Sequence, residues 1–124
     1  MATREDRVKE FNETAGGRTE SQGGSFGVQL ICFSEELAEL NEAMAQYVAA
    51  PSETKRKELI KEWADVQVTL SNLAWFFEFD GEEAFKLVAD ANMSKFNEDG
   101  TPILREDGKV LKGPNYAPAD MTGL

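Results

Sequence analysis

Five acidic side chains stand in two short groups that could bind a metal ion. Glu35, Glu36 and Glu39 form the pattern Glu-Glu-x-x-Glu, and Glu62 and Asp65 form Glu-x-x-Asp. Residues three or four apart on a helix are neighbours, so Glu36 and Glu39 would share one face, and Glu62 and Asp65 another. Glu35 would point about 100° away from Glu36. The spacing therefore predicts four carboxylates, two on each helix, that can act together.

The residue types limit which metal ion such a site could hold. The chain has no histidine and one cysteine, Cys32, which is expected to face the core. A site made only of carboxylates favours a hard cation, which we expect to be Mg²⁺, with Mn²⁺ as a substitute. Like charges gathered in a partly dry groove destabilise the fold unless a cation neutralises them. The alternative, an exposed acidic face without a metal, is common on helices, and the spacing alone leaves both readings open.

Two long helices would carry these acids. Apolar residues recur at spacings of three and four over residues 26–50 and again over residues 52–79, with Pro51 as a stop and Ser52 as an N-cap. The two apolar seams consist of Leu30, Phe33, Leu37, Leu40, Met44 and Tyr47, and of Leu59, Trp63, Val66, Leu70, Leu73 and Phe77. We expect the helices to pack antiparallel with Trp63 in the core, and both acidic groups to flank the seams.

The remaining segments are shorter. Residues 4–13 predict a short helix, the Gly-rich residues 16–24 a loop, and residues 80–97 a fourth helix on which Asn92 and Lys95 share a face. Asp107-Gly108 between short extended runs predicts a hairpin, followed by an irregular tail. The fold class is therefore all-α, in a single domain over residues 1–124, divided into residues 1–24, 25–98 and 99–124.

Composition restricts the partners. The 124 residues carry a formal net charge of −10, which would repel nucleic-acid polymers and acidic membrane surfaces. No apolar run is long enough to span a bilayer and no signal peptide is evident, so we expect a cytoplasmic protein. The apolar residues exceed what one small core can use, so we expect a homodimer or a tetramer.

The two acidic groups, on two helices, resemble the signature of the all-α NTP pyrophosphohydrolase superfamily, which includes MazG, dimeric dUTPases and phosphoribosyl-ATP pyrophosphohydrolase. Ala91-Asn92-Met93-Ser94-Lys95 and the segment from Asp107 to Tyr116 are similar to MazG-like members, and the resemblance covers roughly residues 26–120. It implies a four-helix MazG-like bundle completed by oligomerisation. It also implies Mg²⁺-dependent hydrolysis of a nucleoside triphosphate between its α- and β-phosphates, giving a monophosphate and pyrophosphate.

The resemblance also assigns roles to residues. Glu36, Glu39, Glu62 and Asp65 would bind Mg²⁺, and Glu35 would orient or deprotonate the attacking water. Lys95 would contact phosphate, and Asn92 the sugar or a metal-bound water.

Other residues are candidates from their position alone. Asn72, one helical turn beyond Thr69 on the stripe that contains Glu62 and Asp65, could read the base or sugar. Arg105, Lys109, Lys112 and Tyr116 could close over the phosphates from the tail of the same or a neighbouring subunit, because a triphosphate needs cationic donors beyond the metal.

Two alternatives stay open. Phosphoribosyl-ATP pyrophosphohydrolases typically carry lysines shortly before the Glu-Glu pair, whereas residues 26–34 here contain none. That difference favours a free nucleotide, and a deoxynucleoside triphosphate is the expected substrate. A non-enzymatic helical dimerisation or metal-binding module would have the same helices without turnover.

Overall fold

The computed structural model describes residues 1–124, and most of the chain is helical. The chain forms two compact units, Met1–Phe79 and Asp80–Leu124, which are described separately. The first contains α1 (Arg4–Thr14), the 3-10 helix η1 (Glu20–Gln22), α2 (Phe26–Ala49) and α3 (Glu53–Phe77). The second contains α4 (Gly81–Met93) and the strands β1 (Ile103–Leu104) and β2 (Val110–Leu111). No helix has both the length and the apolar character needed to cross a membrane.

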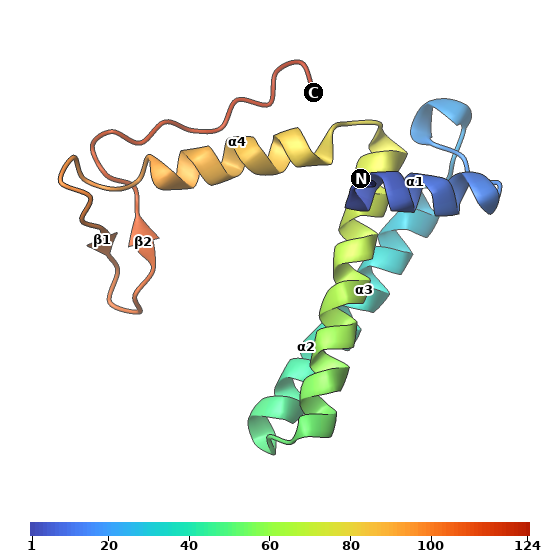
Figure 1. Ribbon diagram of the computed structural model, residues 1–124, viewed down its shortest axis with the longest axis horizontal. Helices are drawn as coiled ribbons and strands as arrows, with labels where there is room; N and C mark the ends of the chain where they lie inside the picture. The colour runs from blue at the N-terminus through green and yellow to red at the C-terminus, as the bar shows by residue number, and fades with distance from the viewer. The chain divides into compact units, whose positions relative to one another are not determined.

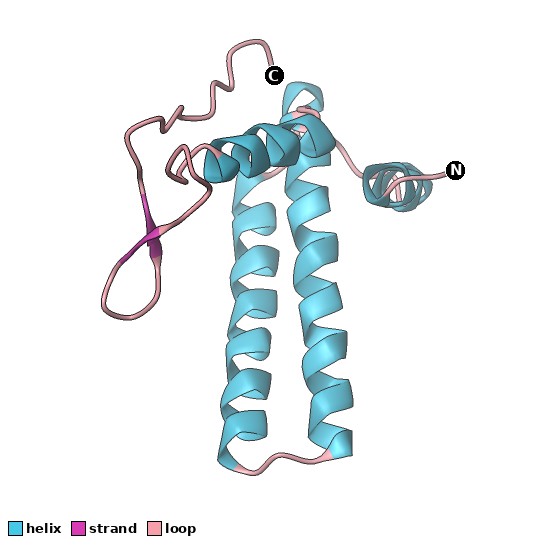
Figure 2. Ribbon diagram, turned by 60° about the vertical axis from the view of Figure 1, so that its left-hand side comes forward, coloured by secondary structure: helices cyan, strands magenta, loops and turns pink.

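The two long helices α2 and α3 lie side by side and antiparallel (Figures 1 and 2). Each begins at a serine N-cap, because Ser25 Oγ accepts a hydrogen bond from the Val28 amide at 3.3 Å and Ser52 Oγ accepts one from the Lys55 amide at 3.1 Å. Their bounds agree with the predicted ranges to within about two residues. The capping serines and Pro51 therefore define the hairpin that carries both acidic groups.

Only half of each predicted apolar seam is covered. The half-buried residues are Phe33, Leu40 and Tyr47 on α2 and Leu59, Val66 and Leu73 on α3. The others form two exposed columns, Leu30, Leu37 and Met44 on α2 and Trp63, Leu70 and Phe77 on α3. The core assignment of Trp63 is wrong, since its exposed fraction is 53%. A single neighbouring helix covers one side of a seam and leaves the other side to solvent. Cys32, also expected to face the core, is exposed.

Most of the buried residues of the first unit lie in the C-terminal half of α3, namely Thr69, Ser71, Ala74 and Phe76. Phe76 is fully buried and packs edge-on against Phe77, with ring centroids 5.0 Å apart. The segment predicted as a loop contains η1, and the hydroxyls of Thr19 and Ser21 each donate to Glu78 at 2.9 Å. These bonds tie the α1–α2 connection to the C-terminal end of α3.

In the second unit, α4 ends at Met93, earlier than the predicted Asn97. The cause is Ser94, whose Oγ donates to the Ala91 carbonyl at 2.6 Å and accepts from the Ala117 amide at 2.9 Å. The tail therefore takes over hydrogen bonds where further helix was expected. The predicted hairpin is present, with Ile103 opposite Leu111 and Leu104 opposite Val110.

Candidate metal centre

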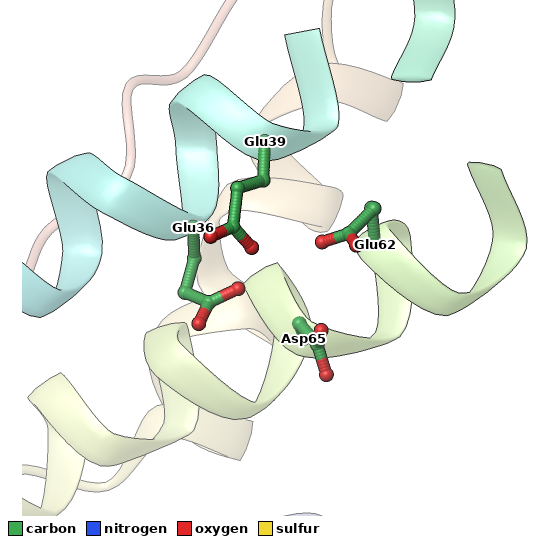
Figure 3. A group of neighbouring side chains, drawn as sticks. All are labelled: Glu36, Glu39, Glu62 and Asp65. Atoms are coloured by element: carbon green, nitrogen blue, oxygen red, sulfur yellow. The ribbon is translucent and has the colours of Figure 1, made fainter. Parts of the chain in front are cut away.

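Four carboxylates converge between α2 and α3. Glu36 and Glu39 project from α2, and Glu62 and Asp65 project from α3 (Figure 3). One oxygen from each carboxylate lies within 4.8 Å of one from every other. Because the helices are antiparallel, the first acid of one pair lies nearest the second acid of the other. The two sequence groups thus form one cluster, which we call the carboxylate cluster.

The cluster contains charge that no protein donor compensates. Glu36 Oε2 and Glu62 Oε2 are buried and accept no hydrogen bond. Burial raises the pKa of Glu36, and the negative charges of Glu39, Asp65 and Glu62 raise that pKa further. Unpaired buried oxygens are uncommon in folded proteins and call for an explanation. A hard divalent cation would supply the missing positive charge, and the all-oxygen donor set fits Mg²⁺ or Mn²⁺.

One lysine faces the cluster. Lys61 Nζ lies 2.7 Å from Asp65 Oδ2 and 3.4 Å from Glu62 Oε1. The hydrogen bond and charge of Asp65, followed by the charge of Glu62, raise the pKa of Lys61. Sequence reasoning missed Lys61, although its i, i+4 spacing to Asp65 was a usable signal. A single ammonium group cannot balance four carboxylates.

Glu35 lies outside the carboxylate cluster. It directly precedes Glu36 on α2 and its side chain is exposed to solvent. Because Glu35 is exposed, its carboxylate can contact water without breaking a buried hydrogen bond.

Asn72 lies two helical turns beyond Asp65 on α3 and is half-buried. Asn12 Nδ2 donates a hydrogen bond to Asn72 Oδ1 at 2.7 Å, and Asn72 Nδ2 donates to Gln29 Oε1. These three amides come from α1, α3 and α2, and all line one cavity. Asn12 and Gln29 were not predicted, because each meets Asn72 only through the packing of one helix on another, α1 on α3 and α2 on α3.

The second unit contains Asn92 and Lys95. Asn92 is exposed on α4, whereas Lys95 lies past the end of that helix. The expectation that both share one helix face is therefore wrong for Lys95. Its backbone amide donates to the Asn92 carbonyl at 3.2 Å in a turn, and its ammonium group forms no ion pair.

The other predicted substrate contacts belong to the hairpin and tail. Arg105 Nε donates to Asp107 Oδ1 at 2.9 Å across the hairpin turn, which lowers the pKa of Asp107. Lys112 Nζ lies 4.9 Å from the centroid of the Tyr116 ring, a cation–π contact. Lys109 is exposed. Of these cations, Lys109 alone has no side-chain partner within the second unit.

No family model matches the chain, and a comparison with curated proteins found no match.

Proposed function

We propose that this protein is a Mg²⁺-dependent nucleoside triphosphate pyrophosphohydrolase. The observation that carries the proposal is the carboxylate cluster, in which one oxygen of each of four acids lies within 4.8 Å of the others. Two of its buried oxygens have no hydrogen-bond partner. A solvated acidic face would not bury unpaired carboxylate oxygens, so the arrangement favours a bound divalent cation over an exposed acidic face without a metal. Glu36, Glu39, Glu62 and Asp65 would hold it.

The proposed reaction consumes one water molecule. The water oxygen bonds to the α-phosphorus, the bond between that phosphorus and the bridging oxygen breaks, and pyrophosphate leaves. When bound, the divalent cation supplies positive charge that offsets the negative charge of the phosphates. Glu35 would accept the proton of the attacking water, a role that suits an exposed carboxylate adjacent to the ligands.

The substrate also needs donors on its phosphates. Asn92, Lys95, Arg105, Lys109, Lys112 and Tyr116 are the proposed contacts. Lys95 and Lys109 suit this role best, because neither ammonium group is engaged by an acid of the chain. Arg105 would first have to release Asp107. Asn72 remains a proposed contact to the base or sugar.

We further propose that two copies of the chain pair through the exposed apolar columns into a four-helix MazG-like bundle. Leu37 directly follows Glu36, and Trp63 directly follows Glu62. In each helix, the column residue comes one position after a cluster acid and is therefore rotated about 100° around the helix axis from that acid, in the direction of the chain. Since α2 and α3 are antiparallel, equal rotation places both columns on the same face of the hairpin. A face carrying Leu70 at 46% exposure and Trp63 at 53% is too apolar to be left in water.

A product screen tests the proposed activity. Ribo- and deoxyribonucleoside triphosphates and phosphoribosyl-ATP are incubated with the protein and Mg²⁺, and monophosphate and pyrophosphate are quantified. We expect pyrophosphate from at least one deoxynucleoside triphosphate. Glu36→Gln and Asp65→Asn should lower kcat by roughly a hundredfold or more, because each removes a proposed metal ligand. Glu53→Gln, an exposed acid on α3 ion-paired with Lys57, is the matched control.

The competing function is a non-enzymatic metal-binding module. Its cluster would bind Mg²⁺ or Mn²⁺ in a calorimetric titration while no triphosphate released pyrophosphate. If folded Glu36→Gln and Asp65→Asn proteins hydrolysed every nucleotide at the wild-type rate, the assignment of the cluster as catalytic would be wrong.

A further inference from the structure

A cavity of about 700 Å³ lies in the first unit, lined by α1, α2 and α3. We call it the α1 cavity. Its volume is in the range of about 300–1,000 Å³ that small-molecule sites occupy. Its lining combines amides, among them Asn12, Gln29 and Asn72, with the apolar side chains of Phe11 and Val68. Such a lining suits a flat, polar-edged ligand, because rings pack on apolar side chains while amides bond to the ring edge.

The α1 cavity adjoins the carboxylate cluster along both long helices. On α2, Cys32 lines the cavity one turn before Glu36. On α3, Thr69 lines the cavity, and its hydroxyl donates to the Asp65 carbonyl at 2.8 Å. Because the helices are antiparallel, Cys32 and Thr69 both lie toward the same end of the hairpin from the carboxylate cluster. Gln29 and Asn72 each lie two turns from a cluster acid, about 10 Å along the axis.

The linked amides retain free hydrogen-bonding groups. Asn12 Nδ2 and Asn72 Nδ2 each use one hydrogen in the chain of bonds from α1 through α3 to α2. Asn12 Oδ1 remains as an acceptor, and Gln29 Nε2 remains as a donor, without a protein partner. Heterocyclic bases present adjacent donors and acceptors on their edges, and Asn and Gln are the side chains that pair with such edges in both senses.

We propose that the α1 cavity holds the nucleobase of the triphosphate and that Asn12, Gln29 and Asn72 recognise the base through its hydrogen-bonding edge. This inference rests on the proposed function for the phosphate end of the ligand. It adds two recognition residues, Asn12 and Gln29, and makes α1 part of the substrate site. The arginines Arg4 and Arg7 at the same cavity favour an anion instead, and the experiment separates these two occupants.

The test compares an intact deoxynucleoside triphosphate with 2-deoxyribose 5-triphosphate, which has the same sugar and phosphates but no base. Asn72→Leu and Gln29→Leu should lower kcat/KM for the intact substrate roughly tenfold to a hundredfold, because buried base edges would lose their partners. The same variants should change kcat/KM for the base-free substrate by less than about threefold. Asn41→Leu on the exposed surface of α2 is the matched control.

Asn72→Asp guards against a folding defect, because it keeps the shape of the side chain and replaces a donor by an acceptor. Asn72→Asp loses the donor to Gln29 Oε1, so its thermal melt should fall by no more than that of Asn72→Leu, and its preference among bases should change. Equal losses on both substrates would show that the amides are structural and would overturn the inference. So would a wild-type protein that hydrolyses the base-free substrate as fast as the intact one, as expected if the cavity binds phosphate.

A binding measurement separates failure of the inference from failure of the proposed function. Deoxynucleosides, which have no phosphate, are added to ¹⁵N-labelled protein, and the side-chain amide signals of Asn12, Gln29 and Asn72 are followed. We expect these signals to shift. Shifts in a protein that hydrolyses no triphosphate would support the base site and reject the activity, whereas turnover without shifts would reject the base site alone.

Discussion

Lys61 Nζ lies 2.7 Å from Oδ2 of Asp65, one helical turn further along α3. The ammonium group of Lys61 therefore pairs with a carboxylate that is also a proposed ligand of the metal ion. With 66% of its side chain exposed, Lys61 is held weakly and can leave Asp65. We infer that Lys61 competes with the metal for Asp65 when the site is formed.

Replacing Lys61 by methionine should tighten divalent-cation binding. Lys61→Met removes a competing positive charge, and exposed ion pairs are weak, so the dissociation constant for Mn²⁺ should fall by roughly twofold to fivefold. A Mn²⁺ titration followed by electron paramagnetic resonance measures it. Lys57→Met is the control, since Lys57 pairs with Glu53 at 3.5 Å and away from the cluster. Weaker binding by Lys61→Met would instead mean that Lys61 orients Asp65 for the metal.

Metal binding should depend on pH through Glu36. Because the pKa of Glu36 is raised by burial and by its acidic neighbours, the cation must displace a proton from Glu36 at any pH below that raised pKa. The affinity for Mn²⁺ should therefore rise as the pH increases from the usual glutamate range, and it should level off above the raised pKa of Glu36. Glu36→Gln should bind more weakly and lose most of this dependence. An unchanged slope in Glu36→Gln would assign the proton to another group.

The same shift affects stability without metal. The folded chain binds the Glu36 proton more tightly than the unfolded chain, so the contribution of Glu36 to the free energy of unfolding falls as pH rises from the usual glutamate range through the raised pKa. Added Mg²⁺ should offset this loss. Thermal melts with and without Mg²⁺ should therefore diverge as pH rises, and melts that stay parallel would contradict this linkage.

A charge placed on the exposed apolar columns should abolish association. Leu70→Glu puts a carboxylate on the α3 column, and burying it unpaired in a dimer would cost several kcal/mol. Sedimentation velocity should show a monomer for Leu70→Glu and a dimer or tetramer for the wild type. Ile31→Glu is the control, because Ile31 is exposed by 58% and belongs to neither apolar column. A wild-type monomer with full activity would refute the proposed bundle.

The sequence predicted those parts of the fold that depend on local patterns. The α2–α3 hairpin was predicted because Ser25, Pro51 and Ser52 mark helix ends, and the seams have strong helical spacing. The convergence of the four acids followed from the same periodicity. The end of α4 was not predicted, because it depends on the bond between Ser94 and the distant Ala117. Local propensity carries no information about such a partner.

The errors at the site have the same origin. Trp63 fits the helical spacing of a core residue, but spacing does not say how many helices cover a seam. Asn12 joins Asn72 only because α1 packs against α3, which is a tertiary contact. Lys61 is the exception, since its distance in sequence from Asp65 was sufficient to predict the ion pair.

Two glycines at the start of α2 should respond oppositely to alanine. A Cβ at Gly24 would come within 2.7 Å of Phe76 Cε2 and still closer to the Arg18 carbonyl oxygen, whereas a Cβ at Gly27 would meet nothing nearer than 3.8 Å. Gly24→Ala should therefore lower the free energy of unfolding by about 1–3 kcal/mol through overpacking. Gly27→Ala should raise it by about 0.5–1 kcal/mol, because a helical glycine loses more entropy on folding than alanine does. Urea denaturation of both variants measures the difference, and a neutral Gly24→Ala would show that the backbone at Gly24 does not need its close approach to Arg18 and Phe76.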